Sequence, residues 1–144
     1  MKMPKQEEMG INGFVKFNRI EFEIEIDKNN QLAKEFIKRL PISSEANNIG
    51  GEIYFRVPGV DLEYDGTQQE EFEIGDIVYW RSPIGEDKFA IAMLYGNTQY
   101  SNWKTPRTSS PCVKIGRLMA DTQQMESLQS GENVKIFLEK INHQ

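Results

Sequence analysis

Aromatic and polar side chains recur along this chain at positions where they could together hold a ligand. Tyrosine and tryptophan offer flat surfaces for apolar groups, and carboxylate, hydroxyl and guanidinium groups can orient a bound molecule through hydrogen bonds. This combination favours recognition of a small molecule or peptide, and it contains no catalytic constellation. The candidate binding residues with these properties are Glu52, Tyr54, Trp80, Tyr95, Thr98, Trp103 and Arg107.

The segment from 96 to 110 is where the sequence places such a site most naturally. It is rich in threonine, serine, proline and aromatic residues, and it separates two strand-like runs. Trp103 lies among polar residues, where no hydrophobic period demands burial, so contact with a ligand explains it as well as packing on the fold does. For Arg107, a loop-fixing bond to backbone carbonyls is favoured over a fork onto a carboxylate.

Structural explanations compete with binding for the other candidates. Trp80 and Tyr95 each end an apolar run, so core packing explains them equally well. Glu52 shares a predicted strand face with Tyr54 and Arg56, and an outward ion pair worth less than ~1 kcal/mol would account for it. The sequence therefore leaves these roles open.

Several other chemistries lack their residues. The chain has one cysteine, Cys112, and one histidine, His143, which cannot supply a zinc site, and no histidine near Cys112 would activate it as a nucleophile. The run 61–66 imitates the start of a calcium loop, but Phe72 stands where a bidentate acid is required, so a hairpin turn is favoured. We expect no metal, no cofactor and no catalytic residue.

Length and composition indicate one globular domain. The chain has 144 residues, of which 38% are hydrophobic and 27% charged, and no apolar run approaches the ~18 residues of a membrane span. A net charge of −5 argues against nucleic-acid and membrane partners. The single cysteine and the polar N-terminus favour a cytoplasmic location. Oligomeric state stays open.

Hydrophobic periodicity predicts a mainly β protein. Residues 19–27 alternate between apolar and acidic side chains, as a half-buried strand does, and Asn30 can cap a helix that ends before Pro41. A flexible arm is expected over residues 1–13, ahead of a domain spanning 14–144. About eight short strands with two short helices favour a closed barrel. The further predicted strands are 52–57, 60–64, 71–74, 77–80, 89–95, 112–118 and 134–138, and the second helix is 121–128.

The order of several short motifs resembles the prokaryotic cyclophilin-like family over roughly residues 19–141. The resemblance implies a closed cyclophilin-like β-barrel flanked by helices, in proteins whose activity is mostly unassigned. Relatives often carry tryptophan where this chain has Ile49, and proline where it has Arg81 and Gln99, so a pocket lined by that tryptophan would be altered here. The motifs are Leu40-Pro41, Asn47-Asn48-Ile49-Gly50, Glu52-Ile53-Tyr54-Phe55, Gly75-Asp76-Ile77-Val78-Tyr79-Trp80, Leu94-Tyr95-Gly96-Asn97-Thr98 and Ile115-Gly116-Arg117.

Peptidyl-prolyl cis-trans isomerase is the alternative function. The run from Tyr54 to Gly59 echoes the cyclophilin segment in which an arginine, here Arg56, polarises the prolyl amide. Twisting that bond crosses ~20 kcal/mol, which a donor and an apolar pocket can lower without a nucleophile or metal. However, the run of Phe, Met and Gln that follows the glycine in cyclophilins is absent, because this chain has Val60-Asp61-Leu62 there. The only histidine, His143, lies next to the C-terminal residue. The sequence therefore favours binding without a reaction.

Overall fold

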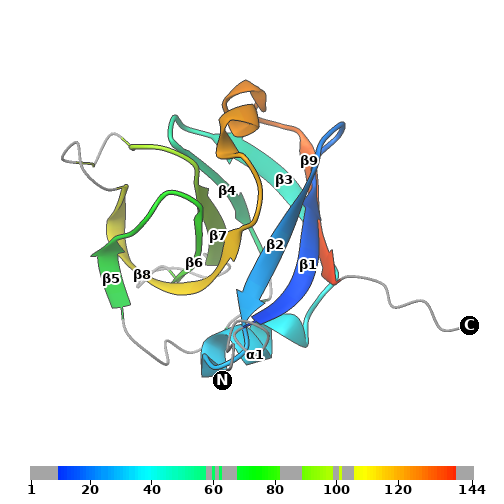
Figure 1. Ribbon diagram of the computed structural model, residues 1–144, viewed down its shortest axis with the longest axis vertical. Coiled ribbons are helices and arrows are strands. Elements are labelled where there is room, and N and C mark those ends of the chain that lie inside the picture. Colours follow the sequence, from blue (N-terminus) through cyan, green and yellow to red (C-terminus); the bar gives the residue numbers. More distant parts are fainter. Residues whose placement is uncertain are drawn as a thin grey trace, which may run out of the picture.

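The computed structural model describes residues 10–57, 60, 62, 68–81, 89–98, 101 and 106–138, with the side chain of Ser109 excepted. Within these ranges the chain forms mainly β-strands, with one α-helix and one 3-10 helix (Figure 1). The elements are β1 (Gly10–Lys16), β2 (Glu21–Asp27), α1 (Gln31–Ile37), β3 (Ile42–Asn48), β4 (Glu52–Arg56), β5 (Gln68–Glu71), β6 (Asp76–Arg81), β7 (Phe89–Leu94), β8 (Arg107–Leu118), η2 (Thr122–Ser127) and β9 (Asn133–Leu138).

Eight of the described strands close into an antiparallel barrel. Their order is β2-β1-β9-β3-β4-β7-β6-β8, and the ring closes because β2 also pairs with β8, with Ile24 opposite Leu118. β5 pairs with the first half of β8 and stands outside this ring. Closure removes most of the free strand edges that would otherwise invite aggregation. The predicted closed, mainly β barrel is confirmed.

Alternation along the strands fills the barrel. Phe22, Ile24 and Ile26 of β2 are at most 3% exposed, whereas Glu21 before them and Glu23 between Phe22 and Ile24 face solvent. Each such buried side chain contributes roughly 1.5–3 kcal/mol of hydrophobic stabilisation. The half-buried strand predicted from this alternation is therefore confirmed.

The two helices cover opposite ends of the barrel (Figure 1). The Asn30 side chain accepts hydrogen bonds from the backbone amides of Leu32 and Ala33, at 2.8 and 3.2 Å, as the predicted N-cap should. Leu32, Ala33 and Phe36 of α1 are buried at one end of the barrel, and Met125 of η2 is buried at the other.

Two strands of the structure, β1 and β3, are absent from the sequence prediction. The structure has Gly10–Lys16 in β1, so residues 10–13 of the expected arm belong to the sheet, while residues 1–9 lie outside the described part. β3 is an additional strand that periodicity misses, because five of its seven residues are polar and Ala46 is its one fully buried residue. Its pairing with β4 and β9 holds it in the sheet.

The other differences fall around β5 and β8. β5 spans Gln68–Glu71, earlier than the expected 71–74, and β8 begins at Arg107, inside the expected loop 96–110. Serine, threonine and proline made that stretch resemble a loop, yet its pairing with β5 supplies the strand with backbone partners. Of the predicted strand 60–64, Val60 and Leu62 are described, and both are buried outside any strand.

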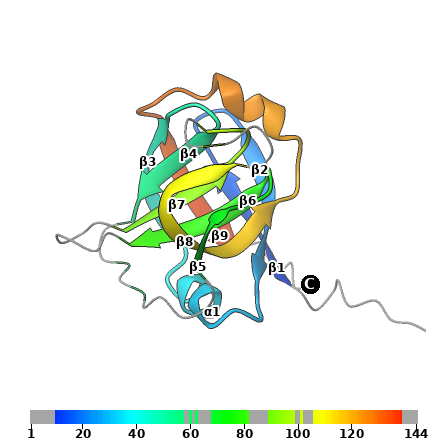
Figure 2. The same ribbon diagram turned by 90° about the vertical axis from the view of Figure 1, so that its left-hand side faces the viewer.

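A second apolar cluster lies on the outer face of the barrel. It joins Val78 of β6, Ala92 and Leu94 of β7, and Cys112 of β8, together with Phe72 after β5. In Figure 2 the curved β8 (yellow) crosses in front of β7. β5 and the first half of β8 therefore cover part of the outer sheet surface and create a sheltered edge beside it.

Candidate functional site

Two alanines of β7 form the floor of an outer-face pocket of about 340 Å³. Tyr54 of β4 lies opposite Ala92, and Trp80 of β6 lies opposite Ala90. Because side chains alternate along a strand, these four residues share the outer face of the sheet. Alanine ends at its Cβ, so the space between the larger side chains stays empty. The pocket is lined by Ile49, Glu52, Tyr54, Arg56, Trp80, Ala90, Ala92, Thr108, Ser110 and Cys112.

The aromatic walls of the pocket are Tyr54 and Trp80. The indole Nε1 of Trp80 donates a 2.6 Å hydrogen bond to Oγ of Ser110, which fixes the ring against β8. Both rings are half-buried and pack against the outer apolar cluster. Each therefore presents a firmly held, flat surface to the pocket.

β8 supplies the third side of the pocket through Thr108, Ser110 and Cys112. The hydroxyl of Thr108 donates to the backbone carbonyl of Ser110 at 2.6 Å, and the thiol of Cys112 donates to the same carbonyl at 3.4 Å. Burial raises the pKa of the Cys112 thiol to about 12, with smaller contributions from the charges of Glu52 and Glu70. The thiol is therefore protonated near neutral pH and is no nucleophile.

Glu52 is the perturbed acid of the pocket. Desolvation by burial raises the pKa of its carboxyl from 4.5 to about 7. Among the described residues, no hydrogen bond or ion pair engages this carboxyl. No hydrogen bond or opposite charge therefore offsets the rise in pKa caused by burial, and both the protonated and the ionised carboxyl are populated near neutral pH.

Arg56 lines the other end of the same strand face. Four residues at ~3.3 Å each separate it from Glu52 by about 13 Å. Its side chain is exposed and, within the described part of the chain, has no ion pair. The ion pair between Glu52 and Arg56 that the sequence suggested is therefore absent, and the pocket carries an acid at one end and a cation at the other.

Three of the seven predicted binding residues come together in this pocket: Glu52, Tyr54 and Trp80. Tyr95 lies outside the lining; its hydroxyl donates to Oδ1 of Asn48 at 2.7 Å and its ring packs on the barrel core. Thr98 is also outside the lining. It is buried and donates a 2.5 Å hydrogen bond to the backbone carbonyl of Arg107, which ties the loop to β8.

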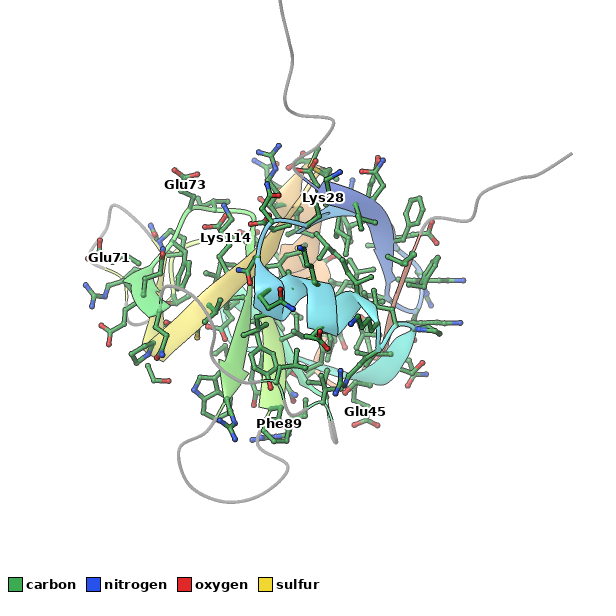
Figure 3. The ribbon with its side chains drawn as sticks, turned by 90° about the horizontal axis from the view of Figure 1, so that it is seen from below. Lys28, Glu45, Glu71, Glu73, Phe89 and Lys114 are labelled. Carbon is green, nitrogen blue, oxygen red and sulfur yellow. The ribbon has the colours of Figure 1, made fainter. Side chains whose placement is uncertain are left out.

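The Arg107 side chain fixes β5 to β8. Its guanidinium contacts Glu70 at 2.7 Å and Glu71 at 2.8 Å, and Figure 3 shows Glu71 beside β5 at the edge of the molecule. The expected bond to backbone carbonyls is therefore wrong about the partner, because the guanidinium forks onto two carboxylates of β5. Trp103, the remaining candidate, lies outside the described residues.

The alanine floor was not predicted from the sequence. Its signal was present in Phe89–Leu94, where small residues at 90 and 92 alternate with the barrel-core residues Ile91 and Met93. Small side chains at every second residue of the strand lie next to one another on one face and leave room there. Ile49, at a position where tryptophan was expected in relatives, is 42% exposed at the rim of the pocket.

The described residues contain neither a metal-binding cluster nor a membrane-spanning helix. No group of three or more histidine, cysteine or acidic side chains there could hold a metal ion. No helix in this part of the chain is long and apolar enough to cross a bilayer. What the pocket offers is therefore an acid, an exposed guanidinium and two aromatic rings.

Comparison with known proteins gives the family. The model of the family described as cyclophilin-like matches residues 13–137 of the chain. The chain belongs to the cyclophilin-like family. This cyclophilin-like protein is also similar to a hypothetical protein from Archaeoglobus fulgidus whose solution structure is known, with a TM-score of 0.72 and 28% sequence identity over 91% of this chain and 96% of that one. The comparison with curated proteins finds no significant match.

Proposed function

We propose that this cyclophilin-like protein binds a small molecule or a short peptide in the outer-face pocket between β4, β6, β7 and β8. The observation that carries the proposal is the convergence of Glu52, Tyr54 and Trp80 above the floor formed by Ala90 and Ala92. A pocket of about 340 Å³ lies at the lower end of the range for small-molecule sites. Few polar groups among aromatic walls are typical of such sites.

A pocket-filling substitution tests the proposal. Ala90→Leu places a branched side chain between Arg56 and Trp80, so it should exclude ligands from the pocket. The matched control is Ala120→Leu, since Ala120 is exposed and lies outside the pocket lining. A library of small molecules and short peptides is screened by NMR against all three proteins.

The expected result is a set of ligands that bind the natural chain and Ala120→Leu but not Ala90→Leu. Overpacking can cost roughly 1–3 kcal/mol, so the free energy of unfolding of each variant is measured by urea denaturation. If folded Ala90→Leu binds the same ligands equally well, the pocket is not the binding site.

Prolyl isomerisation is a second candidate, supported by the position of Arg56. The exposed guanidinium lies across Ala90 from Trp80, so a prolyl ring on the alanine floor would lie within reach of a donor. A hydrogen bond to the prolyl nitrogen weakens amide resonance and lowers the barrier to rotation. No catalytic base is needed.

The isomerase candidate predicts accelerated cis-trans exchange of a proline peptide in a protease-free assay. Arg56→Ala and Ala90→Leu should both abolish the acceleration, whereas Arg19→Ala, at an exposed position in the turn before β2, should leave it unchanged. Absence of any rate above background at high protein concentration would reject this candidate.

A cytoplasmic location, expected from the single cysteine, stays a prediction. It is supported by Cys112 being a buried free thiol, which needs no oxidising compartment. Fractionation of the cells that make the protein, followed by immunoblotting, would test it.

A further inference from the structure

We propose that the ligand of the outer-face pocket carries an organic cation, an ammonium or guanidinium group, which binds the carboxylate of Glu52 beside the ring of Tyr54. This inference rests on the proposed binding function and names the chemical class of the ligand. The apolar part of the ligand would lie on Ala90 and Ala92 and extend toward Trp80.

The positions of Glu52 and Tyr54 define the cationic end. The two residues are separated by one position on β4, so their side chains project from the same face of the sheet about 6.6 Å apart at the backbone. A carboxylate gives a cation a charge-assisted hydrogen bond, and the face of a phenol ring attracts the same charge. A neutral hydroxyl can donate to the carboxylate but lacks the ionic attraction and the attraction of the ring face, and an anion is repelled by the carboxylate.

The nearby cations of the protein are engaged elsewhere or lie at the far end of the pocket. Arg107 is bound by Glu70 and Glu71, and Lys114 contacts Asp76 at 3.1 Å. Arg56 is about 13 Å along the strand from Glu52. The Glu52 carboxyl is thus a half-buried acid that the described part of the protein leaves without a counter-charge, and a ligand cation would supply one.

Arg56 also sets the direction of the ligand. Its guanidinium would repel a cation at the Trp80 end and favour a carbonyl or carboxylate there. The cation is therefore expected only at the Glu52 end.

Cation binding should depend on pH. Of the titratable and charged groups around Glu52, Tyr54 and Arg56 of β4 and Cys112 of β8 line the same pocket, and the Cys112 thiol interacts electrostatically with Glu52 and with Glu70 of β5. Other charged groups on the adjoining strands are ion-paired, Arg107 with Glu70 and Lys114 of β8 with Asp76 of β6. With a carboxyl pKa of about 7, roughly a tenth of the carboxyl is ionised at about pH 6 and nine-tenths at about pH 8. A cation that requires the carboxylate should bind about tenfold more tightly at the higher pH.

Three fragments of similar size test the charge preference: benzylamine, benzyl alcohol and benzoate. Each is titrated into isotopically labelled protein and followed through the amides of β4 and β7 and the indole N–H of Trp80. The same titrations use Glu52→Gln, which keeps the shape of the side chain and removes its charge, and Glu45→Gln, an exposed control on β3.

The inference predicts that benzylamine binds at least about tenfold more tightly than the other two fragments. The preference and its pH dependence should disappear in Glu52→Gln and persist in Glu45→Gln. If benzyl alcohol or benzoate binds the pocket as well as benzylamine, the cation is rejected and the binding function stands. If none of the three perturbs the pocket at about 10 mM while the library yields ligands without a cation, the inference is likewise rejected. If the library also yields no pocket ligand, both proposals fail.

Discussion

Replacing Glu52 by glutamine should stabilise the protein in alkaline solution and leave its stability almost unchanged in acid. Burial raises the pKa of this carboxyl from 4.5 to about 7, so folding favours the protonated form. Between these values the folded state holds more protons than the unfolded state, and the free energy of unfolding falls as pH rises. Glutamine resembles the protonated acid and cannot ionise, so the variant escapes this loss.

The magnitude follows from the two pKa values. A change from 4.5 to about 7, at ~1.4 kcal/mol for each tenfold change in proton affinity, corresponds to about 3 kcal/mol when the carboxyl is fully ionised. Because Glu52 faces an open pocket and is only half-buried, solvent screening reduces this value, and we expect about 2 kcal/mol. The contribution is fully present below about pH 4.5 and is lost by about pH 8.

Urea denaturation at a series of pH values measures this effect. The difference in free energy of unfolding between Glu52→Gln and the natural chain should be near zero at about pH 4 and about 2 kcal/mol in favour of the variant at about pH 8. Glu45→Gln is the control, because Glu45 is exposed on β3 and lies at the lower edge of the molecule in Figure 3. Its difference should not change with pH. A pH-independent difference for Glu52→Gln, or a variant less stable at about pH 8, would refute the argument that burial without a partner governs this carboxyl.

Three further predictions concern the surroundings of the pocket. The Cys112 thiol, whose pKa is about 12, should react with a disulfide reagent at about pH 8 at least ~100-fold more slowly in the folded protein than in the urea-unfolded protein. Equal rates in the two states would mean that the thiol is accessible and ionised in the folded protein. Gly51→Ala should lower the free energy of unfolding by about 2 kcal/mol or more, because its φ is +80° and the added Cβ would clash with the backbone carbonyl of Asn97. Gly50→Ala is the control and should lose only about 1 kcal/mol, because Gly50 has a similar φ of +88° but open space around the added Cβ. Equal losses of the two variants in calorimetry would contradict the clash. Arg107→Ala should lower the free energy of unfolding by about 1 kcal/mol, because it removes the ion pairs with Glu70 and Glu71 of β5, and it should leave ligand binding unchanged. Loss of binding without loss of stability would instead place Arg107 in the binding site.

The barrel was predictable from sequence where its strands are amphipathic. β2 alternates between buried apolar residues and glutamates, and Asn30 caps α1 as its side-chain chemistry suggests. β3 was missed because pairing with two neighbours, rather than burial of a hydrophobic face, holds its polar residues. Long-range pairing also decides the start of β8, whose first residues partner β5. Such pairing leaves no periodic signal in either segment.

The candidate site was predictable in part for a related reason. Glu52 and Tyr54 share a strand face, which period-two alternation indicates directly. That Trp80 joins them across β7 depends on strand order and register, which the sequence does not show. The alanines at 90 and 92 carry no chemistry of their own, yet their small size opens the pocket. The polar and aromatic side chains of loop 96–110 therefore favoured that loop over the sheet face as the predicted site.

Contacts between a bound ligand and the floor of the pocket test the central claim most directly. Nuclear Overhauser effects are measured between the protons of a screened ligand and the alanine methyl groups of the labelled protein. We predict contacts to the methyl groups of Ala90 and Ala92, together with the indole N–H of Trp80. Ligand contacts confined to other surfaces, with none to Ala90 or Ala92, would contradict a binding site on the outer face of the barrel.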